Sequence, residues 1–340
     1  MMDSKIAKSL LLSKSLLQNN VARMASKSFR HSGGATRRMT SKTQHAWHRL
    51  RPSLKEFVTD QQNASTVAML PDALKQKMLS DPSPGESLYQ ETLVESTSWV
   101  NDCIKNEMKK PTGEAAYTTN LLESYDAMVW RHNSVYHWRM NQEEAQGIYD
   151  DCLLESKSHC EIAVGTGLFL DELDFSKCAQ LSGVTLVDLQ PDALQACQSR
   201  LQENPHFVNI QIDQVHANIL EDPPSNLQTS FDSVAANFLV HCLPPGKETI
   251  STTFSHCASL LRDGGIFFGS TTILGKELLE DAENAGPASV DTINTYNEIG
   301  VFGNRDHSFR DLSEALHESF QDVEVWRVGY CAAWKARIPK

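Results

Sequence analysis

The chain has 340 residues, 40% of them hydrophobic, and a formal net charge of -12 at pH 7. This length and hydrophobic content suffice for one large domain with extensions. The sequence has no apolar run of roughly 18 residues, so it predicts no membrane span. Residues 1–51 hold eleven of the 31 Lys and Arg but a single acid, Asp3, so the rest carries 20 basic and 42 acidic side chains. That acidic remainder disfavours nucleic acid as a partner and favours a small-molecule substrate.

Eight cysteines are scattered along the chain, at positions 103, 152, 160, 178, 197, 242, 257 and 331. They form no CxxC pair and no His/Cys cluster with the spacing of a zinc site. The pattern predicts a reducing compartment and no structural metal.

Residues 1–53 are rich in Ser, Lys and Arg. Apolar residues spaced along an amphipathic helix, interrupted by Lys14, are typical of a mitochondrial or plastid transit peptide rather than of a secretory signal. The alternative is a disordered basic tail on a cytoplasmic protein.

Residues 54–116 are predicted to be a linker and helical extension. Between 56 and 84 the chain is polar and is interrupted by Pro71, Pro82 and Pro84, which indicates a linker with one short helix. An apolar stripe then predicts a helix over 87–109.

The segment 117–149 is dense in aromatic and basic residues. Helices of this composition, placed just before the first strand of the main domain, could cover a bound cofactor. The alternative is that Trp130, Tyr136 and Trp138 pack in the core.

Strands and helices alternate over the main domain, residues 117–340, as they do around a parallel sheet. The predicted strands are 159–164, 184–188, 207–212, 231–236, 266–271, 320–327 and 329–336. The predicted helices lie near 168–175 and at 191–203, 247–261 and 308–319, and residues 275–307 form an insert. The fold class is therefore α/β: a Rossmann-like, seven-stranded, mostly parallel sheet with an antiparallel last strand, helices on both faces and an N-terminal helical extension.

A glycine turn and a distant carboxylate predict a nucleoside site. The strand ending at Val164 runs into Gly165-Thr166-Gly167, and the next strand ends in Asp188, which can accept hydrogen bonds from two ribose hydroxyls. A dinucleotide site would need a small residue where Leu170 stands, and no Tyr-x-x-x-Lys motif is present. S-adenosyl-L-methionine, which has no pyrophosphate, is favoured over NAD.

The main domain resembles the class I S-adenosylmethionine-dependent methyltransferases, of the type-12 small-molecule group. The matching segments are EIAVGTG (161–167), LVDLQPDAL (186–194), HANIL (216–220), FDSVAANFLVHCLP (231–244) and LLRDGGIFFGSTTIL (260–274). Ala163 departs from the family pattern, which has a glycine there.

The resemblance implies roles for the first two strands. Glu161 would orient the amino group of the methionine moiety, and the backbone at Gly165 and Gly167 would pass beneath it. Asp188 would hold the ribose hydroxyls.

The resemblance also implies residues for the adenine and the methyl group. Leu189 and Ile219 would pack on the adenine, and Asn218 would meet its exocyclic amine. Asn237 and Phe238 would lie near the transferred methyl.

Methyl transfer to a small organic acceptor, most consistent with O-methylation, is the predicted function. Holding acceptor and methyl in line is the protein's main contribution, and a phenol, acid or amine would also need a base. His241 is the first candidate base because it follows the fourth strand, and its alternative is a core histidine. His307 is a weaker candidate in the insert, which with Tyr296 and Phe302 could form a substrate lid.

Two other functions stay open at this point. The long extension would suit a non-catalytic organelle protein that retains the cofactor fold, and the nucleoside unit alone would suit an NAD-dependent oxidoreductase. The identity of the acceptor and the oligomeric state are not predicted.

Overall fold

The computed structural model describes residues 53–80, 87–107, 117, 119–272 and 275–340 of the protein. The segment predicted as a transit peptide or basic tail lies outside these residues except for Ser53, and its role stays a prediction. Within the described ranges, no helix has both the length and the apolar character needed to cross a bilayer.

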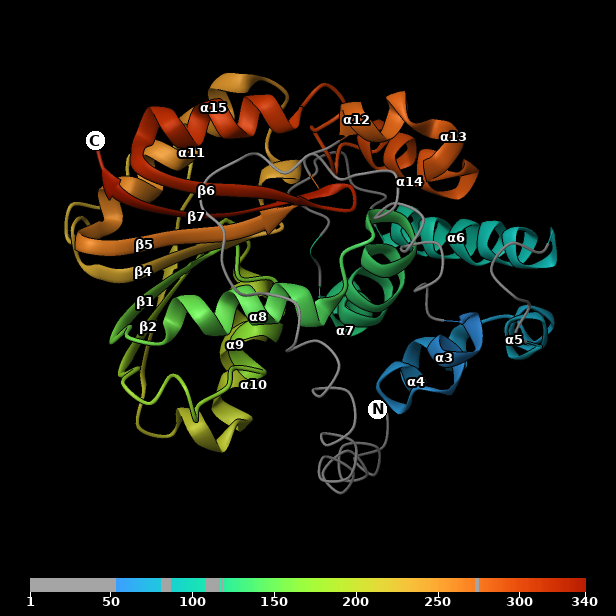
Figure 1. Ribbon diagram of the computed structural model, residues 1–340. Helices are drawn as coiled ribbons and strands as arrows, with labels where there is room; N and C mark the ends of the chain where they lie inside the picture. The colour runs from blue at the N-terminus through green and yellow to red at the C-terminus, as the bar shows by residue number, and fades with distance from the viewer. Residues whose placement is uncertain (1–52, 81–86, 108–116, 118, 273–274) are drawn as a thin grey trace, which may run out of the picture. The chain divides into compact units, whose positions relative to one another are not determined.

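A seven-stranded sheet lies at the centre of the main domain (Figure 1), with the order β3-β2-β1-β4-β5-β7-β6. The strands are β1 (Ser158–Ile162), β2 (Gly183–Asp188), β3 (Gln211–His216), β4 (Phe231–Asn237), β5 (Leu261–Thr271), β6 (Phe320–Val328) and β7 (Cys331–Pro339). Strand β7 inserts between β5 and β6 and is antiparallel to both, whereas β1 to β5 pair in parallel. The predicted sheet, with its antiparallel last strand, is confirmed.

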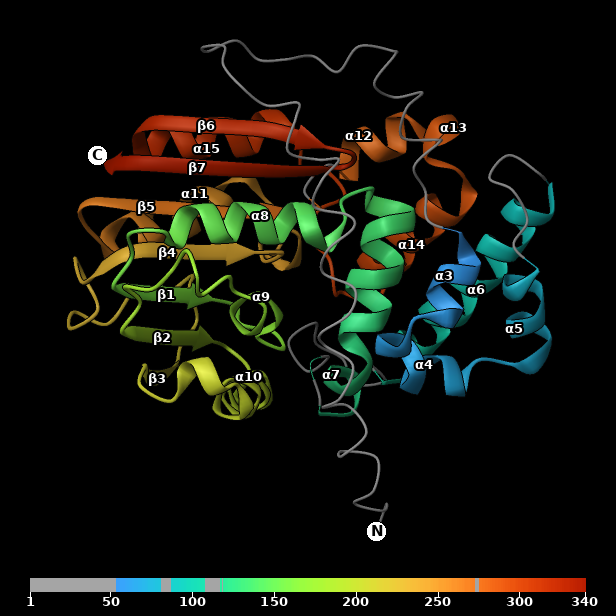
Figure 2. The same cartoon turned by 60° about the horizontal axis from the view of Figure 1, so that its bottom comes forward.

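Helices cover both faces of the sheet (Figure 2). One face carries α8 (Gln142–Leu153), α9 (Leu168–Asp171) and α10 (Pro191–Glu203), and the other carries α11 (Lys247–Leu260) and α15 (Phe309–Ser319). Pro191 stands at the first position of α10, where its missing N–H costs nothing. Capping boxes start α8 at Asn141 and α15 at Ser308. The predicted helices 191–203 and 308–319 agree closely with α10 and α15, whereas the helix predicted near 168–175 ends at Asp171.

Strand β3 begins four residues later than predicted. The apolar Phe207 and Val208 suggested a strand from residue 207, but Pro205–Phe207 forms the short 3-10 helix η4 instead. Pro205 fixes the backbone for that turn, and Phe207 is buried against the α10 side of the core. Phe207 is therefore buried as part of a short helix that precedes β3, and not as a residue of the strand.

The prediction of a linker with one short helix before residue 84 was wrong. The described part of that stretch forms α3 (Leu54–Thr59), the 3-10 helix η1 (Gln61–Asn63), α4 (Ala64–Met69) and α5 (Asp72–Leu79). Pro71 directly precedes α5, so this proline starts a helix and does not break one. The helices bury a small apolar cluster, which includes Leu54, Leu74 and Met78, against α6 (Ser87–Glu107).

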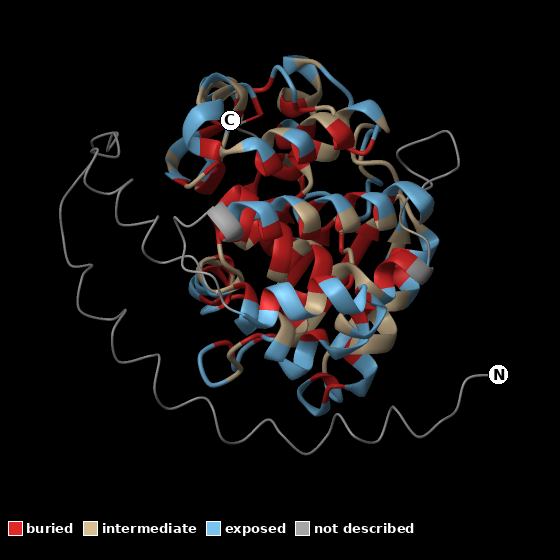
Figure 3. Ribbon diagram, turned by 90° about the vertical axis from the view of Figure 1, so that its right-hand side faces the viewer, coloured by how far each residue is buried: buried red, intermediate tan, exposed pale blue. Residues whose placement is uncertain are grey.

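Two further helical segments complete the main domain. The first holds α7 (Thr119–Tyr125) and the π-helix η3 (Asp126–Trp138), and the second, in the insert, holds α12 (Gly275–Glu280), α13 (Ala282–Ala285) and α14 (Pro287–Glu298). Buried histidines join η3 to α6, with His132 bonded to Ser96 and His137 to Thr97. Figure 3 shows buried residues on the inward sides of the helices and exposed residues on their outward sides.

Candidate active site

A cavity of about 180 Å³ opens where the parallel strands β1, β2 and β4 end. The residues that line it are Tyr117, Tyr125, Trp130, Glu161, Ile162, Ala163, Val164, Gly165, Thr166, Leu168, Phe169, Val187, Asp188, Leu189, Gln190, Ala217, Asn218, Ile219, Leu220, Asn237, Phe238, Leu239, Cys242, Leu243, Pro244 and Val301. Ligands of open α/β sheets bind in this position, beyond the carboxyl ends of the strands.

The turn after β1 has three residues with left-handed backbone. Ala163, Gly165 and Gly167 have φ angles of 61°, 51° and 73°. Ala163 and Gly165 line the cavity, whereas Gly167 does not. A Cβ on Gly167 would lie 2.6 Å from the Cys197 sulfur, so this glycine allows α10 to approach the turn rather than making room for a ligand.

We expect Ala163→Gly to stabilise the protein. The φ of 61° strains a residue that has a Cβ, and glycine relieves a cost of about 1 kcal/mol, net of its own entropy. Thermal unfolding should show the gain as a rise of about 2 °C. Gly165→Ala is the matched control: its added Cβ meets nothing within 4 Å, so only the φ of 51° acts and stability should fall. A loss of stability in Ala163→Gly would contradict this reading.

Asp188 ends β2 beside the glycine turn. Its Oδ1 accepts a hydrogen bond of 2.8 Å from the backbone N–H of Gln190. Burial raises the pKa of the carboxyl to about 6, although backbone N–H groups, among them those of Gln190 and Gly165, act in the opposite direction. Such a group gains from hydroxyl donors that would replace the water it has lost.

Leu189, Asn218 and Ile219 line the same cavity as Asp188. The Oδ1 of Asn218 is used within its own turn, where it accepts from the backbone N–H of Leu220 at 3.0 Å. Its amide nitrogen has no protein partner among the described residues and can bond a ligand.

Asn237 and Phe238 follow from the end of β4. The Oδ1 of Asn237 accepts from Ser270 at 3.0 Å, while its buried Nδ2 lacks a partner in the described structure. Phe238 has a φ of 54°, a strained conformation that persists where surrounding contacts impose it. Its ring lies 4.2 Å from that of Trp130, between centroids.

Trp130 belongs to η3 and is the residue through which this helix lines the first cavity. Its ring also packs edge-on against Phe169, with the centroids 4.6 Å apart, and it is 4% exposed. Trp130 thus packs in the core and also lines the cavity, whereas Tyr136 packs in the small apolar cluster that includes Leu54 and Leu74. Core packing, one of the two alternatives that the sequence left open, thus holds for Trp130 and Tyr136, and cover of a bound cofactor by this segment stays a prediction.

An ion pair attaches the start of η3 to the glycine turn. Arg200 of α10 lies 2.6 Å from Asp126 and donates to the carbonyl of Thr166 at 3.0 Å. The Thr166 hydroxyl donates to the other oxygen of Asp126 at 2.6 Å. Partly buried, charge-assisted hydrogen bonds therefore hold η3 and the glycine turn together.

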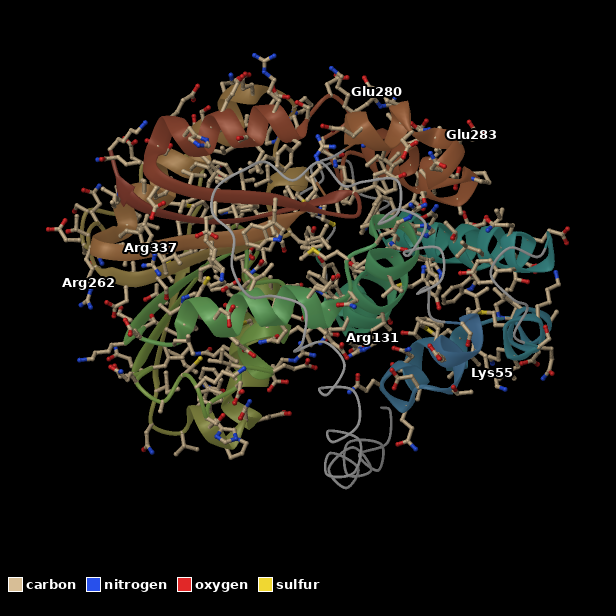
Figure 4. The ribbon with its side chains drawn as sticks, in the orientation of Figure 1. Lys55, Arg131, Arg262, Glu280, Glu283 and Arg337 are labelled. Atoms are coloured by element: carbon tan, nitrogen blue, oxygen red, sulfur yellow. The ribbon has the colours of Figure 1, made fainter. Side chains whose placement is uncertain are left out.

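The charged side chains that line the first cavity are all acidic. Glu161 and Asp188 line it, and the lining residues within the described structure include no Lys, Arg or His. Arg131 of η3, labelled in Figure 4, is not among them, and its charge instead offsets part of the effect of burial on the pKa of Glu172. Two carboxylates without a counter-charge favour a cationic ligand and would repel a pyrophosphate.

A second cavity, of about 30 Å³, adjoins the first, since Tyr117, Tyr125, Phe238 and Val301 line both. Its other lining residues are Ile104, Leu121, Val129, Asn133, Trp138, His241, Tyr296 and Phe302. Asn133 donates to the Tyr296 hydroxyl at 2.7 Å. This cavity is walled by aromatic and aliphatic side chains from α6, α7, η3 and α14.

His241 lies on the wall of the second cavity. Its Nδ1 is 2.9 Å from the Thr271 hydroxyl, and no described residue bonds its Nε2. Burial, and then repulsion from His307, lower the pKa of His241 to about 3. The imidazole is therefore uncharged at pH 7, and it is a weaker base than the ordinary pKa of histidine suggested.

His307 is not brought to either cavity. It is 3% exposed, and burial is the main cause that lowers its pKa. In the same insert, Gly303 lies against the backbone of Leu243, where an added Cβ would be 2.1 Å from the carbonyl oxygen. That glycine serves close packing, so a hinge there has no support, while Tyr296 and Phe302 do cover the second cavity. A lid motion of the insert stays a prediction.

The fold thus gathers most of the predicted residues in one place. Eight of the nine predicted cofactor residues line the first cavity, all except Gly167, and His241 lies beside them on the second. The sequence analysis missed Tyr149 and His159, which contact Glu161. His159 could have been found, because residues two apart on a strand share a face.

The first cavity fits S-adenosylmethionine on these observations. The sulfonium and ammonium groups of that molecule are cationic, which suits a lining with two carboxylates and no cation. Its ribose hydroxyls suit the partly desolvated Asp188, and the unpartnered Nδ2 of Asn237 offers a donor. The residues that would hold it are those that the resemblance implied, apart from Gly167.

Comparison with protein families matches residues 160–267 to a family described as "Methyltransferase domain". Demethylluteothin O-methyltransferase of Streptomyces thioluteus is 30% identical over 224 residues, which are 66% of this chain and 90% of that protein. An O-methyltransferase of Aspergillus niger is 29% identical over 184 residues, which are 54% of this chain and 91% of that protein.

Solved structures share the fold. An O-methyltransferase family protein from Burkholderia thailandensis aligns with a TM-score of 0.52 and 14% identity, over 88% of this chain and 99% of that one. At this identity the likeness concerns the fold alone.

Proposed function

We propose that this chain, which belongs to the class I S-adenosylmethionine-dependent methyltransferases, transfers a methyl group to a hydroxyl oxygen of a small organic acceptor. The observation that carries the proposal is the pair of adjoining cavities, one with two carboxylates and the other apolar, which meet at Phe238. The O-methyltransferase names of two relatives support oxygen as the accepting atom.

S-adenosylmethionine, when bound, supplies a methyl carbon that is already activated by its sulfonium, so no residue need act as a nucleophile. The contribution of the chain is to hold two molecules in line, which is worth up to about 7–11 kcal/mol in favourable cases. Tyr117, Tyr125, Phe238 and Val301 line both cavities and would exclude water from the region where they meet.

The lining of the second cavity suits an uncharged acceptor. Its titratable lining residues include Tyr117, Tyr125 and Tyr296, whose pKa values burial raises above the ordinary value of tyrosine, and the uncharged His241. An acceptor carboxylate would lose its hydration there without gaining a cationic side chain. A flat, apolar molecule with a phenol or enol hydroxyl fits this wall. The cavity has room for about one water molecule, so entry requires η3 or α14 to shift.

His241 can accept a hydrogen bond from the acceptor hydroxyl, whose proton is released to water as its oxygen bonds the methyl carbon. Nδ1 of His241 is hydrogen-bonded to the Thr271 hydroxyl, and Nε2 is available to bond the hydroxyl of the acceptor. Because burial opposes the imidazolium, the main contribution of His241 is to accept a hydrogen bond that orients the hydroxyl.

Calorimetric titration of the full chain with S-adenosylhomocysteine, with NADH as the control, tests the cofactor. We expect binding on the order of micromolar for S-adenosylhomocysteine alone. Binding of NADH alone would contradict the proposal, and binding of neither would favour a non-catalytic protein that keeps the fold.

Transfer of labelled methyl to phenols and enols, compared with matched carboxylic acids, tests the acceptor class. We expect transfer to the neutral hydroxyl compounds, and about a tenfold loss in His241→Ala with unchanged S-adenosylhomocysteine affinity. His317→Ala is the control, since this histidine lies exposed on α15. Preferential transfer to the acids would overturn the assignment.

A further inference from the structure

Glu161 receives two hydrogen bonds from inside the protein, and both end on the same oxygen. The Tyr149 hydroxyl of α8 donates to Oε2, and the Nε2 of His159 lies 3.0 Å from that atom. Tyr149 and His159 are both 0% exposed. No described residue donates to Oε1, although Glu161 lines the cavity. One carboxylate oxygen is therefore held by the core while the other is available to a ligand.

Proton positions in this cluster follow from its neighbours. The Tyr149 hydroxyl keeps its proton, because burial and the charge of Glu161 raise its pKa. The Nδ1 of His159 lies 2.8 Å from Ser233 Oγ, which lies 2.7 Å from Ser156 Oγ. Ser156 can donate to the carbonyl of Ser158, and Ser233 then donates to Nδ1 of His159, so that Nε2 carries the proton. That N–H lies 3.0 Å from both Glu161 Oε2 and the Tyr149 hydroxyl oxygen. With this arrangement Tyr149 and His159 each have a proton to donate to Oε2 of Glu161.

The surroundings keep the carboxylate in this orientation. Tyr149 stacks on Phe169 at a centroid distance of 5.6 Å and meets Phe268 edge-on at 5.2 Å. The His159 ring lies against Phe268 as well. Neither donor can follow the carboxylate if it turns, because both rings are fixed on two sides by packing.

We propose that Tyr149 and His159 are positioning residues, which hold Glu161 by Oε2 so that Oε1 accepts a hydrogen bond from the primary ammonium of the cofactor. The inference rests on the proposed function and makes it more specific. The amino-acid end of the ligand is selected by a carboxylate whose direction is set from the core, and no Lys, Arg or His among the described lining residues competes for that carboxylate.

Two ligands separate this role from general damage to the fold. S-adenosylhomocysteine carries the ammonium, and 5′-methylthioadenosine has the same nucleoside and sulfur without the amino-acid part. In the full chain, Tyr149→Phe should weaken S-adenosylhomocysteine binding about tenfold and leave methylthioadenosine binding within about twofold. Glu161→Gln should weaken the binding of S-adenosylhomocysteine alone. The double variant that adds Tyr149→Phe should bind S-adenosylhomocysteine no more weakly than Glu161→Gln does.

Tyr330→Phe is the matched control. Its hydroxyl also donates to a carboxylate, that of Asp281 at 2.8 Å, but neither residue lines the cavities. It should leave both affinities unchanged. If Tyr149→Phe does not fold, His159→Leu and Glu161→Gln carry the same comparison.

The outcomes distinguish the inference from its premise. If the wild-type chain binds neither ligand, the proposed function fails. If it binds both and the Tyr149→Phe, His159→Leu and Glu161→Gln variants weaken both equally or neither, the positioning role alone is wrong. A selective loss of S-adenosylhomocysteine affinity supports it.

Discussion

Asp188→Ala is expected to weaken S-adenosylhomocysteine binding by roughly 10- to 100-fold. The carboxylate at the end of β2 would accept charge-assisted hydrogen bonds from the ribose hydroxyls, and losing them costs about 1.5–3 kcal/mol. Calorimetric titration of the folded variant measures the change. Asp213→Ala, at an exposed aspartate of the neighbouring strand β3, is the control and should bind as the wild type does. An unchanged dissociation constant in Asp188→Ala would show that the ribose lies elsewhere.

The same residue predicts a pH dependence. Burial raises the pKa of Asp188 to about 6, and the ligand prefers the ionised form, so affinity should fall about tenfold from pH 7 to pH 5. Asp188→Asn should bind more weakly and lose this slope. The free energy of unfolding should depend on pH in the opposite direction. Because folding raises the pKa of Asp188, its contribution to stability is largest below the ordinary pKa of 3.8 and is lost as the pH rises through about 6.

Trp130→Ala is expected to lower the free energy of unfolding by about 3–5 kcal/mol. The indole is buried between Phe169 and Phe238, and its removal leaves a void that strained Phe238 cannot fill without moving. Denaturant unfolding measures the loss, and S-adenosylhomocysteine affinity should fall with it because the same ring walls the cavity.

Trp326→Ala is the control for this second prediction. Trp326 is half-buried on the edge strand β6, so its removal exposes less apolar surface and should cost less. If the two variants lose equal stability, Trp130 is not the core contact that its packing indicates. If Trp130→Ala loses stability but retains full affinity, the indole does not contribute to the ligand wall.

The carboxyl ends of parallel strands made the first cavity predictable. Glu161, Asp188 and Asn237 each lie in or at the end of a strand, and parallel pairing brings these ends to one edge of the sheet. Their gathering needs only the strand order that short crossovers impose. Gly167 was predicted with them because the motif names residue types, but its φ of 73° and its contact with Cys197 depend on how α10 packs.

Contacts between distant segments could not be predicted in this way. Asn133 and Tyr296 are 163 residues apart and bond across the second cavity, and Leu54 packs in the same cluster as Tyr136 and Ala288. The polar stretch near Pro71 concealed helices, because their apolar residues are few and are buried only when α6 is present. His307, the weaker candidate base in the insert, lies outside both cavities.

The amino-acid sequence by itself determined the α/β fold, most strands of its sheet, the glycine turn and the carboxylates that line the first cavity. These follow from local periods of two and 3.6 residues and from turn chemistry, which act over a few neighbours. Only the tertiary structure decided which helices close the site, that Ala163 has left-handed backbone, that His241 is uncharged, and that Tyr149 and His159 hold Glu161. Each of these depends on packing and desolvation between segments far apart in the chain, for which a sequence pattern has no local signal.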